Sequence, residues 1–127
     1  MGYCSDKVPD LQIVLGHMGE TVAFWLWRID KKANVGGCLD GLQHNFTHYF
    51  RNNFFVTTSG VFDTKALAHL VDVLDTERVL FSVDSDPEIL SDGTDWLRGI
   101  DPGTNPSLTC DVLQKIAYQN AEKLFWP

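Results

Sequence analysis

The sequence lacks an apolar run long enough to cross a membrane, and it lacks an excess of basic residues. Its 10 Lys and Arg residues are outnumbered by 17 Asp and Glu residues, so the formal net charge is −7 at pH 7. A negative surface argues against nucleic acids and anionic membranes as main partners. It is compatible with a small anionic substrate, because one local arginine can override the overall sign.

Cysteine is also scarce, and its placement excludes two further classes of protein. Cys4, Cys38 and Cys110 are odd in number, far apart and without zinc-ligand spacing, so neither a disulfide scaffold nor a zinc finger is expected. The first residues show no signal-peptide pattern, and we therefore expect a cytoplasmic protein with reduced thiols. The 127 residues, 44% of them hydrophobic, suffice for one globular domain.

Apolar segments alternate with helical segments along the chain. Strands are expected at 11–15, 54–58 and 78–83, and helices at 21–32, 43–51, 64–74 and 108–125. Residues 85–106 are rich in Pro and Gly, and we expect a loop there with a short helix at 95–98. The alternation predicts the α/β class, built from parallel units. Three parallel strands alone would leave both sheet edges open, which suggests a part of a larger barrel.

Each predicted strand ends in residues suited to chemistry. His17 follows the first strand between Gly16 and Gly19, Ser59-Gly60 follows the second, and Asp84 follows the third. The carboxyl ends of parallel strands lie at one edge of a sheet, where α/β proteins place their active sites. We therefore expect His17 and Asp84 to lie close together despite their separation in the sequence.

These residues also have structural interpretations, which the sequence leaves open. His17 with Glu20 is either an imidazole oriented by a carboxylate, or a turn histidine followed by a glutamate that opens a helix. Asp84 is either a metal ligand or proton donor, or a cap for the next segment. Arg28 is either a fork for a substrate carboxylate or a solvated surface charge.

Two further histidines have the spacing of metal ligands on a helix. His44 and His48 lie four positions apart, but no glutamate of the zinc-protease type lies between them. We interpret this pair as mostly structural.

Five stretches resemble the C-terminal part of the metal-dependent, amidohydrolase-related decarboxylases. This group includes the γ-resorcylate, dihydroxybenzoate and salicylate decarboxylases and relatives of aminocarboxymuconate-semialdehyde decarboxylase. The stretches are 13–20 (IVLGHMGE), 27–31 (WRIDK), 48–62 (HYFRNNFFVTTSGVF), 78–84 (RVLFSVD) and 120–125 (NAEKLF). The hydroxybenzoate decarboxylase branch fits best, because Trp-Arg-Ile-Asp follows the histidine motif.

The resemblance implies that residues 1–127 form a partial domain, about three β/α units from the C-terminal part of a (β/α)8 TIM barrel of the metal-dependent hydrolase superfamily. It implies one divalent metal ion, zinc or manganese, with Asp84 as a ligand. His17 would be the active-site histidine, Glu20 its partner carboxylate and Arg28 the arginine near the substrate carboxylate. The implied activity is non-oxidative decarboxylation of a small aromatic acid of the hydroxybenzoate type, with Asp84 transferring the proton, in a homo-oligomeric full-length enzyme.

The sequence departs from the family pattern in two ways. The Glu-x-His ligands of the family's first strand and a histidine of a middle strand have no counterpart, so the metal would be incompletely liganded. Ser85-Asp86-Pro87 stands where an aromatic residue and a proline usually follow the aspartate, and this adds a carboxylate beside the site. Two alternatives follow: a catalytically inert fragment or pseudoenzyme, and a hydrolase of the same superfamily. We expect the isolated chain to bind metal weakly and to show little or no activity.

Overall fold

A computed structural model describes residues 6–35, 41–84 and 87–126, and it contains a parallel three-stranded sheet. The strands are β1 (Ile13–Leu15), β2 (Phe54–Thr57) and β3 (Val79–Leu80), in the spatial order β1-β2-β3. Each pairs with its neighbour in parallel, as in Val14 with Phe55 and Val56 with Val79. The predicted strands and their direction are confirmed, although each is shorter than expected.

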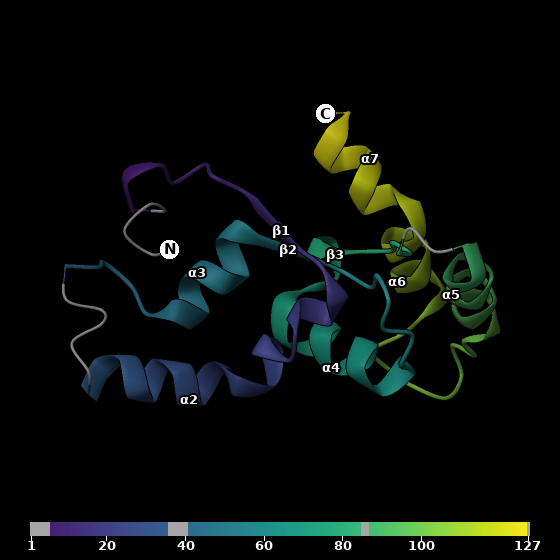
Figure 1. Ribbon diagram of the computed structural model, residues 1–127, viewed down its shortest axis with the longest axis horizontal. Helices are drawn as coiled ribbons and strands as arrows, with labels where there is room; N and C mark the ends of the chain where they lie inside the picture. Colours follow the sequence, from purple (N-terminus) through teal and green to yellow (C-terminus); the bar gives the residue numbers. More distant parts are fainter. Residues whose placement is uncertain (1–5, 36–40, 85–86, 127) are drawn as a thin grey trace.

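Helices connect and cover these strands (Figure 1). They are α2 (Val22–Val35), α3 (Phe46–Asn53), α4 (Thr64–Leu74), α5 (Pro87–Gly99), α6 (Cys110–Gln114) and α7 (Asn120–Phe125). α4 has the bounds predicted for it, and the Asp63 carboxylate caps it by accepting the Ala66 N–H at 2.8 Å. Within the described residues, no helix has the length and apolar character needed to span a membrane.

The prediction of a loop is wrong for residues 87–99, which form α5, and the short helix expected at 95–98 is the C-terminal part of this longer one. Its proline lies at the first helical position, where a missing N–H costs nothing. Gly93, in the middle of α5, is buried against the neighbouring segments. A Cβ atom there would lie 2.6 Å from Val83 and 2.7 Å from the Phe62 ring. This glycine therefore permits close packing of a helix and does not end one.

The C-terminal helix contains an irregular turn that the sequence pattern does not reveal. It begins at Cys110, capped by Thr109, and residues Lys115–Gln119 form a π-helical turn (η3) between α6 and α7. Such turns alter the backbone hydrogen-bonding pattern of a helix. The carbonyl of Ile116 accepts the backbone N–H of Phe81 at 2.8 Å. The irregular turn thus joins the last helix to the end of β3.

The two faces of the sheet differ in their cover. One face carries Phe54, Val56 and Val79, which are almost fully buried in the hydrophobic core. The core is completed by Leu108, just before α6, and by helix side chains that include Phe50, Leu67, Leu70, Leu74 and Ile116. The opposite face carries Val14, which is 47% exposed, and the half-buried Phe55 and Thr57. Parallel sheets normally have both faces covered, so the second face is the less complete one.

Glu77 makes the stability of this fold depend on pH. Its carboxylate lies 2.9 Å from Lys115 Nζ and 2.6 Å from Lys123 Nζ, so it links the start of β3 to the last helix. Hydrogen bonds from Lys123 and then Lys115 lower the pKa of Glu77 below its usual value of 4.5. A carboxyl group with a lowered folded pKa stabilises the protein above its unfolded pKa, and this stabilisation is lost as the pH falls through the folded pKa.

We therefore expect Glu77→Gln to be destabilising at neutral pH by about 0.5 kcal/mol, since the group is 39% exposed and solvent screens it. The difference from wild type should shrink as the pH is lowered from 7 to about 3, because protonation of Glu77 weakens its bonds to the two lysines. Urea unfolding at both pH values measures this, with Glu122→Gln on the exposed surface of α7 as the control. An unchanged difference at low pH would contradict the assignment to Glu77.

Candidate functional site

The segment after β1 has an unusual backbone that determines how His17 is presented. Five consecutive residues adopt positive φ angles: His17 (52°), Met18 (51°), Gly19 (71°), Glu20 (48°) and Thr21 (68°). Only glycine adopts this left-handed region freely, and other residues there cost of order 1–3 kcal/mol each. Such strain persists only where the surrounding structure fixes it, and it is concentrated at functional sites. We call residues 17–21 the left-handed turn.

Local and long-range contacts hold the left-handed turn in place. Within it, Gly19 donates its N–H to the Gly16 carbonyl at 2.8 Å, and Glu20 donates to the His17 carbonyl at 2.9 Å. Met18 is 6% exposed and packs into the hydrophobic core. The backbone N–H of His17 donates to Ser59 Oγ, beyond β2, at 3.4 Å. The turn is therefore anchored to both the core and the neighbouring strand.

The imidazole of His17 lies between two carboxylates. Its Nδ1 is 3.4 Å from Glu20 Oε1, and its Nε2 is 3.5 Å from Asp84 Oδ2. All three side chains are exposed, by 48% for His17, 74% for Glu20 and 47% for Asp84. The structure thus brings together the residues that the parallel arrangement predicts, while their chemical roles stay predictions.

Two residues after β2 complete the site, and the sequence indicated them only as a strand end. Ser59 Oγ lies 2.8 Å from Thr57 Oγ1, so the two hydroxyl groups share a hydrogen bond. Gly60 has a φ angle of 68° and lies against both His17 and Asp84. A Cβ atom on Gly60 would be 3.2 Å from His17 Cδ2 and 3.6 Å from Asp84 Oδ2.

Arg28 lies on α2 and belongs to a neighbouring pocket. This pocket, of about 400 Å³, is lined by Glu20, Trp25, Arg28, Lys32 and three smaller or aliphatic side chains. The Arg28 guanidinium lies 5.9 Å from the Trp25 ring centroid. Glu20 is common to this pocket and to the group around His17.

Three other residues were candidates for the site: His44, His48 and Asp86. The rings of His44 and His48 stack with centroids 3.8 Å apart, next to the buried Tyr49. Across residues 6–35, 41–84 and 87–126, no group of three His, Cys, Asp or Glu side chains could hold a metal ion. Asp86, predicted to add a carboxylate beside Asp84, lies outside the described residues.

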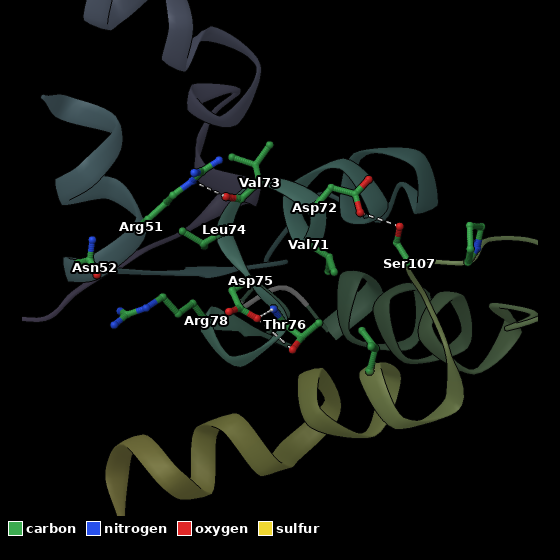
Figure 2. A pocket seen from close by; sticks show the side chains of 12 residues that line it. Arg51, Asn52, Val71, Asp72, Val73, Leu74, Asp75, Thr76, Arg78 and Ser107 are labelled. Carbon is green, nitrogen blue, oxygen red and sulfur yellow. Dashed lines mark hydrogen bonds between the residues drawn. The ribbon is translucent and has the colours of Figure 1, made fainter.

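A larger pocket, of about 790 Å³, lies beside the start of β3, and His17 is not among its lining residues (Figure 2). Its polar groups have partners within the protein. Arg51 donates to the Val73 carbonyl at 2.9 Å, and Ser107 donates to Asp72 at 2.6 Å, as Figure 2 shows. Asp75 accepts the Thr76 N–H in the same pocket. We do not assign this pocket as the functional site, because its polar side chains already form hydrogen bonds within the protein.

Comparison with known proteins gives these residues a context. A family described as amidohydrolase matches residues 4–126. A γ-resorcylate decarboxylase from Polaromonas sp. is 34% identical over 94% of this chain and 36% of the relative. The crystal structure of 5-carboxyvanillate decarboxylase from Sphingomonas paucimobilis is 35% identical, with a TM-score of 0.80 over 96% of this chain and 36% of that one.

A second 5-carboxyvanillate decarboxylase, from Novosphingobium aromaticivorans, was solved with manganese and 4-hydroxy-3-methoxy-5-nitrobenzoic acid. It is 29% identical, with a TM-score of 0.84 over 96% of this chain and 35% of that one. The chain therefore spans about a third of the length of the proteins that it matches.

Proposed function

This chain belongs to the amidohydrolase family, and from that membership we propose that it forms the C-terminal part of the active site of a metal-dependent, non-oxidative decarboxylase. The proposed substrate is a small aromatic acid of the hydroxybenzoate type. The fold is accordingly α/β, part of a (β/α)8 barrel, as the sequence predicts. The proposed domain is a partial barrel over residues 1–127.

The observation that carries this proposal is the placement of His17 between Glu20 and Asp84 at the carboxyl end of a parallel sheet. Barrel enzymes assemble their chemistry at this end of the strands, from residues on several of them. An imidazole held at both ring nitrogens has a fixed orientation, which a positioning or proton-transferring group needs.

In the proposed reaction, Asp84 delivers a proton to the ring carbon that carries the carboxylate. The bond between that carbon and the carboxylate then breaks, its electron pair restores the aromatic ring, and CO2 leaves. Asp84 recovers its proton from solvent, to which it is 47% exposed. Glu20 orients His17, and His17 holds the Asp84 carboxylate in place. Arg28, two turns into α2, is proposed to bind the substrate carboxylate through its guanidinium fork.

The described residues fit a metal site only in part. Asp84 offers a carboxylate, which divalent ions of the zinc and manganese type accept, but the described part of the chain has no group of three His, Cys, Asp or Glu side chains that could hold the ion. When bound, the ion supplies neutralisation of the negative charge on the substrate oxygens. Manganese in a solved relative supports this assignment, and the shortage of ligands leads us to expect weak metal binding by the isolated chain.

The surroundings of the site support two further parts of the proposal. Phe24, Trp25 and Trp27 on α2 are 58%, 52% and 76% exposed, which is unusual for large aromatic side chains. These exposed side chains on one helix support the proposal of a homo-oligomer, with a second copy as the partner. The acidic net charge and the few, widely spaced cysteines continue to favour a cytoplasmic location without nucleic-acid or membrane partners.

A chimeric enzyme tests the proposed function. This chain would replace the matching segment of the Polaromonas γ-resorcylate decarboxylase, and CO2 release from 2,6-dihydroxybenzoate would be measured with manganese. We expect release by the chimera and none by the isolated chain, because the remaining ligands come from the rest of the barrel. A folded, manganese-binding chimera that releases no CO2 would contradict the proposal and favour an inert fragment. Lactone or amide hydrolysis by that chimera would instead favour a hydrolase.

A further inference from the structure

We propose that Ser59 and Gly60 are positioning residues that hold the His17 imidazole against Asp84. The inference rests on the proposed function, because it concerns the same site. It assigns the segment after β2 a role in shaping that site, although neither residue is proposed to react with the substrate.

Ser59 acts on the backbone of the left-handed turn. Its Oγ accepts the N–H of His17, the first residue of the turn, at 3.4 Å across 42 positions of sequence. The same oxygen shares a hydrogen bond of 2.8 Å with Thr57 Oγ1, at the end of β2. A hydroxyl group has one proton and two lone pairs, so Thr57 restricts the rotation of the Ser59 hydroxyl. The strand thereby fixes an acceptor for His17.

Gly60 acts on the side chains. Its missing side chain leaves room for the His17 ring and the Asp84 carboxylate to meet. A Cβ atom would lie 3.2 Å from His17 Cδ2, 3.7 Å from Nε2 and 3.6 Å from Asp84 Oδ2. The positive φ of 68° gives glycine a second reason to occupy this position.

The contact between His17 and Asp84 is sensitive to small displacements. Its distance is 3.5 Å, which lies at the outer limit of a hydrogen bond. A shift of the ring by a few tenths of an ångström would therefore end it. Ser59 and Gly60 both limit displacements of this size, since Ser59 fixes the backbone of His17 and Gly60 sets the space around its ring.

Imidazole NMR signals of the 127-residue chain, labelled at histidine, test the inference without metal or substrate. His17→Gln identifies the signals of His17 among the 4 histidines. In the wild-type background, Asp84→Asn should shift the His17 ring signals. In Ser59→Ala and Gly60→Ala backgrounds this response should be lost, whereas Ser59→Thr, which keeps the hydroxyl, should retain it.

Gly41→Ala is the matched control, because Gly41 has a φ of 85° but no atom within 4 Å of its Cβ position. It should share any cost of a positive φ and keep the full response. Thermal unfolding confirms that each variant is folded, and Ser59→Cys, a weaker acceptor of similar size, replaces Ser59→Ala if that variant is unfolded. Full responses in the Ser59 and Gly60 variants, or no response in wild type, would overturn the inference. Loss of decarboxylation in the chimera would leave it unaffected.

Discussion

Replacing Asp84 with asparagine is expected to lower the decarboxylation rate of the chimera by about 10³-fold, the size typical of a lost general acid. Asparagine has the same shape and can still lie near His17 Nε2, but it carries no proton that it can transfer to a ring carbon. Asp95→Asn, on the exposed surface of α5, is the matched control and should retain full activity. CO2 release and manganese affinity should both be measured, since the carboxylate is also the proposed metal ligand.

The two measurements separate the proposed roles of Asp84. A lower rate at saturating manganese indicates the proton-transfer role, while recovery of the rate at high manganese indicates that the carboxylate serves chiefly as a ligand. Asp84→Asn with wild-type rate and manganese affinity would contradict both roles.

Replacing Asn120 with alanine is expected to lower the free energy of unfolding by about 2–4 kcal/mol, which is large for a single polar side chain. Asn120 is 1% exposed, and its Nδ2 donates to the carbonyls of Thr76 at 2.7 Å and Val79 at 2.8 Å. Alanine would remove the donor from the buried Val79 carbonyl and from the partly buried Thr76 carbonyl, and an unpaired buried acceptor costs about 1–3 kcal/mol. Urea unfolding measures the change.

Gln114→Ala is the control for Asn120→Ala, because Gln114 is an exposed residue of the same helical segment. It should change stability by less than about 0.5 kcal/mol. An equally small change for Asn120→Ala would show that the two carbonyls find other partners. A large loss of stability would show that the Asn120 hydrogen bonds are the main contribution to the packing of α7 against β3.

Patterns with a local cause were predictable from the sequence. The leucine and valine spacing of 64–74, with Asp63 before it, predicts α4 and its cap, and both are found. The run FFVTT predicts β2, and the parallel arrangement predicts the meeting of His17 and Asp84. Each follows from periodicity, capping preference or the geometry of parallel strands.

Features with a tertiary cause were not predictable. From the sequence alone, Gly93 suggests an interruption of helical structure. Only the closeness of Val83 and Phe62 shows why α5 needs a glycine at this position. The π-helical turn contains a carbonyl that accepts a hydrogen bond from Phe81, and residues 108–125 alone predict a regular helix. The sequence left open whether Arg28 binds a substrate carboxylate or is a surface charge, and it did not indicate the pocket that Arg28 shares with Glu20.

The left-handed turn has a consequence for the order of folding. Its anchor to Ser59 spans 42 residues, and Met18 needs the hydrophobic core around it, so an unfolded chain has only the short local hydrogen bonds to offset the cost of five positive φ angles. Closing such a distant contact costs loop entropy that pairing of β1 with β2 must first offset. The histidine therefore acquires its geometry after the sheet has formed. A mutation that weakens the pairing of β2 is therefore expected to change the geometry of His17 even where the protein stays folded.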